Sequence, residues 1–308
     1  MKAVWSLWTK PLRANRRPGW LTPKHHLLSW ILSVELARRH YPDTCLITDD
    51  EGAAMLVDGL GLRFGSVSLA LNALTDHAPD WWAIGKLYAY AAQEQPFVHI
   101  DSDVFLWEPL PHALQQAPVF AQHPEYTPFG RSFYRPESIE FDIRRHDGWM
   151  PEEFVSYIPI GGELKAENCG IIGGTRTDFI RHYAGQAIRF IEHPANQKAW
   201  EARPRLDQDF VTFEQLMLAA CVAYHQGRPH SPFANIAIAY LFESYDAALT
   251  LAEERGYTHL VADSKRHPQL SASLERIVAR DFPGGYRRCL DLLSQPRLAP
   301  ERAGAATG

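Results

Sequence analysis

Short apolar segments alternate with longer amphipathic ones through the first third of the sequence. Residues 3–7 and 44–48 have the composition of short buried strands, and residues 26–40 and 51–60 place apolar side chains at helical spacing. Strands that alternate with helices in this way form a sheet with helical crossover connections. The pattern therefore predicts an α/β fold in which an open sheet is flanked by helices.

Size and composition agree with a single large domain. The chain has 308 residues, of which 46% are hydrophobic and 22% charged, and this is the ordinary range of globular proteins. The domain is expected over residues 1–293. Residues 294–308 are rich in Pro, Ala and Gly and are expected to form a disordered tail.

Charge and cysteine usage exclude some classes of protein. The net charge of -5 comes from interspersed acidic and basic residues, so no basic face for nucleic acid is expected. The four cysteines form no CxxC pair and are interpreted as buried, reduced thiols. No apolar run approaches the roughly 18 residues of a membrane-spanning helix. These features predict a cytoplasmic protein without a transmembrane segment.

The strongest local signal is the run PFVHIDSDVFLWEPL. A helix is expected over residues 81–93 with Asp80 as its N-cap, followed by a strand over residues 97–100 that leads into Asp101 and Asp103. Two carboxylates two residues apart at a strand end can hold one divalent cation, Mn²⁺ or Mg²⁺, which then neutralises a diphosphate. The alternative is a pair of solvated turn carboxylates, although apolar flanks on both sides favour the cation.

Residues 122–164 lose this periodicity and are rich in Pro, Gly and aromatic residues. Such a long irregular segment is usually functional, and its aromatic rings would suit the apolar faces of sugars. The rings in question are Tyr126, Phe129, Phe133, Tyr134, Trp149 and Tyr157. Beyond it, strands are expected over residues 169–172 and 259–262, and helices over residues 177–192 and 209–225.

Four stretches follow one another between residues 80 and 265: IGKLYAYAAQEQPFVHIDSDVFL, AENCGIIGG, LDQDF and HLVADSK. In this order they resemble the GT-A-fold glycosyltransferases, and most closely glycosyltransferase family 8. The resemblance implies a GT-A-like, Rossmann-related open mixed sheet. Residues up to about 110 would then bind the sugar donor. Our hypothesis for the aromatic-rich residues 122–164 is that they form the wall on the acceptor side, which could also act as a lid.

The resemblance also implies roles for individual residues. Lys86, on the helix before the aspartates, would contact the donor, and Asn168 and Gly170 would approach the donor sugar. Asp207 and Gln208 would lie at the reaction centre beneath that sugar, as the candidate catalytic residues. Each motif has a structural alternative: a solvated helix lysine, a turn or bulge at Asn168 and Gly170, and a helix cap at Asp207 or the nearby Asp209.

The last stretch supplies His259 and Lys265. A neutral imidazole is a good third ligand for Mn²⁺ beside two carboxylates, although His259 could also be a satisfied core histidine. Lys265 would place a mobile positive charge on the phosphates. At the end of the first strand, Trp8 and Thr9 lie where an open α/β sheet binds nucleotides. Trp8 could stack on the base or belong to the core, and Asp49 could contact the nucleoside or begin the following helix.

The expected function is a metal-dependent glycosyltransferase. The resemblance implies retaining transfer from a UDP-sugar to an acceptor, which could be a glycan, a lipid, a peptide or a small molecule. Two alternatives remain open. One is a haloacid-dehalogenase-like phosphatase with Asp101 as nucleophile and Asp103 as acid. The other is a non-catalytic nucleotide-sugar-binding protein.

Overall fold

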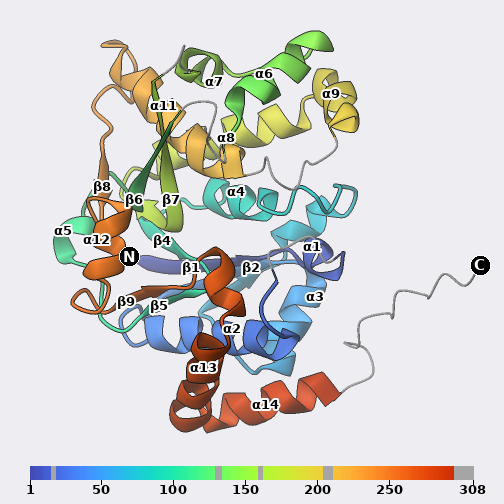
Figure 1. The fold of residues 1–308 in the computed structure, drawn as a ribbon, viewed down its shortest axis with the longest axis vertical. Helices are drawn as coiled ribbons and strands as arrows, with labels where there is room; N and C mark the ends of the chain where they lie inside the picture. Colours follow the sequence, from blue (N-terminus) through green and yellow to red (C-terminus); the bar gives the residue numbers. More distant parts are fainter. Residues whose placement is uncertain (15–18, 129–133, 159–161, 204–210, 295–308) are drawn as a thin grey trace, which may run out of the picture.

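A seven-stranded mixed sheet forms the centre of the computed structural model, which describes residues 1–14, 19–128, 134–158, 162–203 and 211–294 (Figure 1). The strand order is β3-β2-β1-β4-β7-β6-β8. The strands are β1 (Lys2–Leu7), β2 (Thr44–Thr48), β3 (Ser66–Ser68), β4 (Phe97–Ile100), β6 (Val119–Pro128), β7 (Glu163–Gly174) and β8 (Ile238–Tyr240). All neighbours pair in parallel except β7, which is antiparallel to β4 and to β6. The predicted α/β class and mixed sheet flanked by helices are confirmed, and the observed sheet is mostly parallel.

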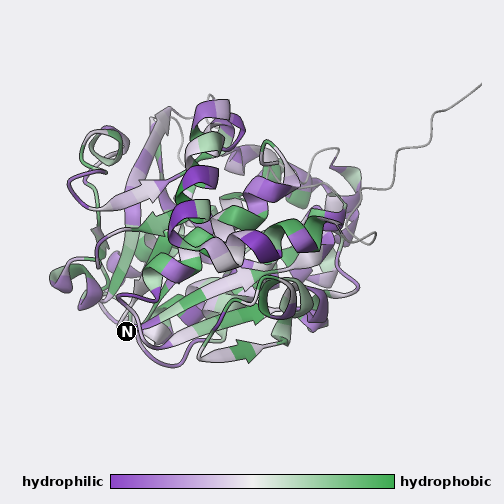
Figure 2. Cartoon of the chain, turned by 90° about the horizontal axis from the view of Figure 1, so that it is seen from below, coloured by the Kyte–Doolittle hydropathy of each residue, from purple (hydrophilic) through white to green (hydrophobic). Residues whose placement is uncertain are grey.

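Helices cover both faces of this sheet, because alternate strand residues point to opposite sides. Val4 packs into a core with the helices on one face, whereas Ala3 and Trp5 pack into a core on the other. The first face carries α4 (Ile84–Ala91), α8 (Thr177–Glu192), η4 (Thr212–Leu216) and α11 (Met217–Gln226). The second carries α2 (Pro23–Ala37), η1 (Ala54–Gly59), α13 (Pro268–Asp281) and α14 (Pro283–Ser294). Figure 2 shows the apolar residues gathered on the strands and the helix surfaces that meet them.

A second, two-stranded sheet lies beside the end of β4. It pairs β5 (Val104–Leu106) with β9 (Tyr257–His259) in antiparallel orientation, with Val104 opposite His259. This pairing brings a residue near the end of the chain next to the aspartates that follow β4. The second sheet therefore brings His259, the predicted third ligand, to the two aspartates.

The order of the strands identifies where such a sheet binds ligands. From β1 the sheet extends to β2 and β3 on one side, and the chain then returns to β4 on the other side of β1. In open α/β sheets, ligands bind at this reversal, outside the carboxyl ends of the parallel strands. Asp101 is the first residue after β4. The aspartate pair thus lies at the reversal point between β1 and β4.

Several predicted boundaries need correction. The helix expected over residues 81–93 begins at Ile84 with Ala83 as its N-cap, so Asp80 does not cap it. The strand expected over residues 259–262 ends at His259, where the chain turns toward the short helix η5 (Ala262–Arg266). Part of the helix expected over residues 209–225 is confirmed by η4 and α11, and its first two residues lie outside the described part of the chain.

The segment 122–164 is more regular than predicted. It contains most of β6 and two helices, α6 (Pro136–Arg145) and α7 (Glu152–Tyr157). Helices of 10 and 6 residues make too few turns for a periodic pattern to stand out. The prediction of an irregular segment was therefore wrong for its described residues.

The remaining short elements connect the main ones. They are α1 (Thr9–Arg13), α3 (Asp50–Ala53), η2 (Ala70–Leu74), α5 (His112–Gln115), η3 (Pro194–Asn196), α9 (Gln197–Ala202) and α12 (Tyr245–Thr250).

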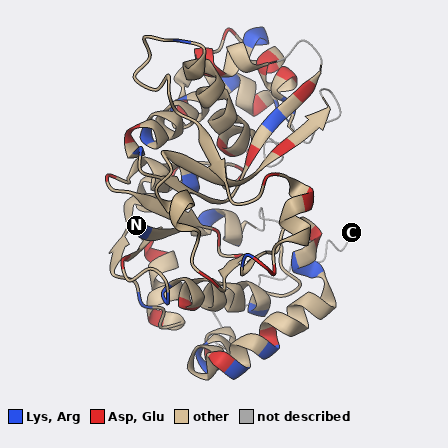
Figure 3. Cartoon of the chain, turned by 90° about the vertical axis from the view of Figure 1, so that its left-hand side faces the viewer, with Lys and Arg blue, Asp and Glu red and all other residues tan. Residues whose placement is uncertain are grey.

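All four cysteines are buried and unpaired, as predicted. Among the described residues, no helix has the length and apolar character needed to cross a membrane. Acidic and basic residues are interspersed along the elements in Figure 3, and residues 295–308 of the predicted tail are not among those described.

Candidate functional site

Asp101, Asp103 and His259 converge at the end of β4. The amide of Asp101 donates to the carbonyl of Gly170 at 3.0 Å, and the amide of Leu260 donates to the carbonyl of Asp103 at the same distance. One carboxylate oxygen from each aspartate and one imidazole nitrogen lie within 4.8 Å of one another. The His259 Nε2 atom is 3.6 Å from Asp103 Oδ1. The backbone of three strands therefore fixes three potential metal ligands.

Gln122 orients the imidazole of His259. Its Oε1 atom lies 2.7 Å from His259 Nδ1 and 2.7 Å from the hydroxyl of Tyr257. A carbonyl oxygen only accepts, so Nδ1 carries the proton and the lone pair of Nε2 faces the aspartates. Burial lowers the pKa of His259, with the charge of Asp103 opposing, and the ring is neutral at pH 7. A Cβ atom at Gly170 would lie 2.5 Å from this ring. Glycine at this position therefore avoids a steric clash with the imidazole.

Lys86 joins the site from helix α4. Its Nζ lies 2.9 Å and 3.0 Å from the two carboxylate oxygens of Asp101 and 2.6 Å from Oε1 of Glu214. The hydroxyl of Tyr90 also donates to Glu214, at 2.7 Å. Burial alone would lower the pKa of Lys86, but the charges of Asp101 and Glu214 raise it above its ordinary value. Lys86 is only 8% exposed, so the alternative of a solvated helix lysine is wrong.

The second lysine, Lys265, forms an ion pair with Asp103. Burial alone would raise the pKa of Asp103, but the charge of Lys265 and its hydrogen bond to the carboxylate hold it well below its ordinary value. Burial raises the pKa of Asp101, against the lowering effect of Lys86. With Glu214, the site holds three carboxylates and two ammonium groups, which corresponds to a formal net charge of one negative. A site with that charge can accept a cation and then attract an anion.

The donor set fits a divalent cation of the Mn²⁺ type. Two carboxylate oxygens and one imidazole nitrogen match the ligand preference of that ion, and His259 is held with its free nitrogen directed at the aspartates. His99 of β4 adds a buried polar atom near Asp101. Its Nδ1 has no hydrogen-bond partner among the described residues and lies 3.7 Å from Asp101 Oδ1, while Nε2 contacts Ser6 Oγ at 2.9 Å.

Three residues predicted near the nucleotide lie in internal contacts instead. Trp8 is 4% exposed and packs in the core, which agrees with the core alternative and leaves no open ring face for a base. The amide and hydroxyl of Thr9 both donate to Asp49, at 2.8 Å and 2.7 Å. Asp49 is the N-cap of α3 and accepts from the amide of Gly52, so it begins the helix, as the second interpretation held.

Asn168 supports an irregularity in strand β7. Residues 121 and 123 of β6 pair with residues 172 and 168 of β7, so extra residues of β7 occupy this stretch. The side-chain oxygen of Asn168 accepts from the amide of Gly170 at 3.1 Å, and its nitrogen donates to Glu125 at 2.7 Å. The bulge alternative for Asn168 is thus confirmed, while Gly170 faces His259. Asp207 and Gln208 lie outside the described residues.

The aromatic residues of segment 122–164 fall into separate groups. Tyr126 is 56% exposed and pairs with Lys165 of β7. The hydroxyl of Tyr157, at the end of helix α7, donates to the backbone carbonyl of Lys165 at 2.8 Å. Tyr134 is 3% exposed and bonds to Glu125. Trp149 stacks on His193 beyond the end of α8. Phe129 and Phe133 lie outside the described residues.

Two residues of the site, Gln122 and Glu214, were not predicted. Gln122 follows apolar residues in a strand, and Glu214 is a single carboxylate in the otherwise apolar run VTFEQLMLAACVA. That lone acid, 1% exposed, was the available signal, because a buried charge requires a partner. Its partner, Lys86, lies 128 residues away in the chain, so spacing alone could not identify the pair.

We expect Gln122→Met to weaken Mn²⁺ binding by about 10- to 100-fold, because the imidazole of His259 loses the acceptor that fixes its ring and tautomer. Methionine has a similar length and adds no charge. Calorimetric titration with Mn²⁺ measures the effect, with the exposed Gln116→Met as the matched control. Equal affinities for Gln122→Met and the parent chain would contradict the orienting role of Gln122.

Comparison with protein-family models places the chain in a family. Residues 1–292 match the family model of DUF6734, described as a family of unknown function. No curated protein matches the chain. The match covers both sheets and every element that contributes to the site. The chain therefore belongs to the DUF6734 family.

Proposed function

We propose that the protein is a metal-dependent glycosyltransferase that uses a nucleotide-diphosphate sugar, with UDP as the expected nucleotide. One observation carries the proposal: Asp101, Asp103 and His259 converge, with two lysines, at the reversal point of an open α/β sheet. This is where such sheets bind nucleotides. The resemblance of four stretches to glycosyltransferase family 8 supports the same assignment, as does the mixed sheet with its antiparallel strand β7.

The charges of the site match a diphosphate ligand. A divalent cation held by Asp101, Asp103 and His259 would supply Lewis-acid stabilisation of the diphosphate as it leaves the sugar. It would change the net charge of the five charged side chains from one negative to one positive. Lys265, which is 18% exposed at its side chain, can then turn from Asp103 to the phosphates. Lys86 stays beneath Asp101, because Glu214 holds it from the other side.

The acceptor side is proposed to lie along the β6–β7 strand pair. The exposed Tyr126 and the half-buried Tyr157 offer aromatic faces there, and such faces cover the apolar sides of sugar rings. Retention of configuration at the anomeric carbon is part of the proposal through the resemblance alone. Asp207 and Gln208 remain its candidate residues at the reaction centre.

The phosphatase alternative receives less support. It requires Asp101 to attack phosphorus with a free carboxylate oxygen, whereas Lys86 contacts both of its oxygens. Asp103, the acid in that reading, would have to carry a proton, but its pKa lies well below the ordinary value because of Lys265. The binding-protein alternative requires the same site and differs only in turnover.

The proposal is tested by screening nucleotide sugars for Mn²⁺-dependent release of the nucleoside diphosphate, with and without sugar, lipid and peptide acceptors. We expect release from at least one UDP-sugar, and we expect a chelator to abolish it. Binding of UDP with Mn²⁺ but no release across the panel would favour the binding protein. Release of phosphate from simple phosphoesters, lost in Asp101→Asn, would favour the phosphatase.

A further inference from the structure

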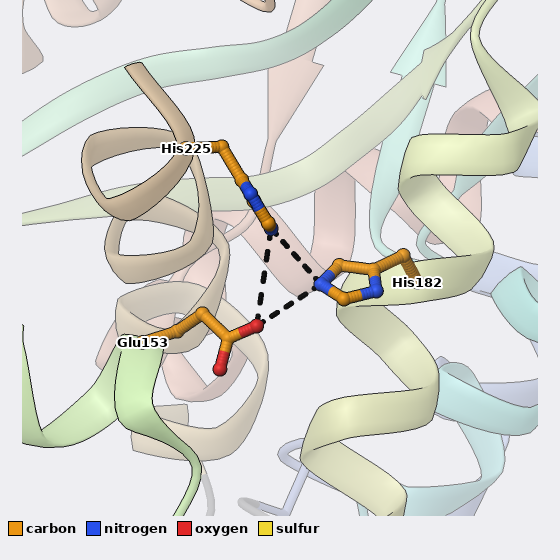
Figure 4. Close-up of side chains that lie close together, drawn as sticks. All are labelled: Glu153, His182 and His225. Atoms are coloured by element: carbon orange, nitrogen blue, oxygen red, sulfur yellow. Dashed lines mark hydrogen bonds and ion pairs between the residues drawn. The ribbon is translucent and has the colours of Figure 1, made fainter. Parts of the chain in front are cut away.

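A second group of metal-ligand side chains lies on the helical layer above the sheet, formed by Glu153 of α7, His182 of α8 and His225 of α11 (Figure 4). The Nε2 atom of His182 is 3.0 Å from Oε1 of Glu153 and 3.0 Å from Nε2 of His225. The Glu153 Oε1 to His225 Nε2 distance is 3.8 Å. Three atoms able to donate lone pairs therefore point at one another from three different helices.

These separations fit a tetrahedral ion. Two ligands that each lie about 2.0–2.1 Å from a tetrahedral zinc ion are about 3.3 Å apart. The three observed separations, 3.0, 3.0 and 3.8 Å, bracket that value. Two imidazoles and one carboxylate form a donor set of zinc sites that leave the fourth position to water or another ligand, whereas Ca²⁺ and Mg²⁺ prefer oxygen ligands.

Further contacts hold the ligands in place. The hydroxyl of Ser231 lies 2.8 Å from Nδ1 of His225, on the far side of that ring. The side chain of Gln186 donates to Oε1 of Glu153 at 3.1 Å. Such outer contacts fix the tautomer and orientation of metal ligands. Glu153 and His225 are buried, while the side chain of His182 is 28% exposed, which leaves a path for an ion from solvent.

The surroundings of Glu153 also favour a cation. The residue is 4% exposed, and its carboxylate lies 3.0 Å from His182 Nε2 and 3.8 Å from His225 Nε2. Among the described residues, Glu153 forms ion pairs with these two histidines only.

We propose that Glu153, His182 and His225 bind a zinc ion that ties helices α7, α8 and α11 together, independently of the site at Asp101. The ligands are 29 and 43 residues apart along the chain, so the ion would crosslink distant segments. The competing explanation is a single proton shared between the two imidazoles, which would satisfy the same contacts without a metal.

The test is a calorimetric titration of the chelator-treated full-length chain with zinc chloride, followed by thermal unfolding with and without zinc. We expect one zinc per chain at this site with a dissociation constant below about 1 µM. We also expect a rise in Tm of at least about 3 °C when zinc is saturating. Glu153→Gln and His182→Ala should each weaken this binding by at least about 100-fold and abolish the rise in Tm. The exposed His112→Ala serves as the matched control, and circular dichroism verifies that each variant is folded.

A variant of the aspartate site tests whether the two sites bind metal independently. Asp103→Asn should leave the affinity of Glu153, His182 and His225 for zinc unchanged. The proposal is overturned if the parent chain binds no zinc tighter than about 100 µM, a value far weaker than structural zinc sites. It is equally overturned if Asp103→Asn removes tight zinc binding while Glu153→Gln and His182→Ala retain it. Neither result depends on whether the chain transfers sugars.

Discussion

Replacing Asp103 with asparagine is expected to weaken the binding of UDP with Mn²⁺ by at least about 100-fold, since the ion that bridges the diphosphate loses a charged oxygen ligand. The substitution preserves side-chain shape. Lys265 loses its partner, but its side chain is 18% exposed and can turn to water, so the fold should persist. Calorimetric titration of UDP in the presence of Mn²⁺ measures the change. His259→Ala should weaken binding less, because both carboxylates remain.

The control for this result is Asp246→Asn, which removes an exposed carboxylate in the first turn of α12. It should leave the affinity for UDP with Mn²⁺ unchanged. Unfolding curves for both variants separate a loss of binding from a loss of structure. If Asp103→Asn is folded and binds UDP with Mn²⁺ as tightly as the parent chain, the diphosphate does not bind through this site.

The first half of the sheet was predictable because its strands are local and strongly apolar. Residues 3–7, 44–48 and 97–100 are bounded by turn-forming or polar residues, and their predicted bounds agree with β1, β2 and β4. The pairing of β6 with β7 was not predicted, because it depends on contacts between segments far apart in sequence. The β5–β9 sheet was missed for the same reason.

The site was predictable only where its residues are neighbours in the chain. Asp101 and Asp103 stand out because two carboxylates interrupt an apolar run, and their convergence with His259 agrees with the motif resemblance. Lys86 was placed near them, but its second partner, Glu214, was not foreseen. The zinc ligands have no common motif, because helices α7, α8 and α11 meet only in the folded chain. The sequence therefore identified the three potential metal ligands at the end of β4, whereas the group of Glu153, His182 and His225 becomes visible only through tertiary packing.

Lys86 is expected to stabilise the fold as well as the site, and Lys86→Met is expected to lower the free energy of unfolding by about 3–5 kcal/mol at pH 7. The reason is that the substitution keeps the aliphatic stem but leaves Asp101 and Glu214 facing each other without a cation. Glu214 is 1% exposed, so water cannot replace the ammonium group. Because the pKa of Lys86 is raised in the folded state, its contribution is fully present at pH 7 and is lost only as the pH rises through that raised value.

Urea unfolding at several pH values measures this loss, with the exposed Lys198→Met as the matched control, which should change the free energy of unfolding by less than about 0.5 kcal/mol. In Lys86→Met the deficit should shrink as the pH falls from 7 toward 5, because one of the two facing carboxylates takes up a proton and the repulsion ends. The double variant Lys86→Met/Glu214→Gln should recover about 1–3 kcal/mol relative to Lys86→Met alone. A Lys86→Met variant as stable as the parent chain would mean that the two carboxylates separate or become hydrated, and that the lysine is not needed to hold Asp101 in the site.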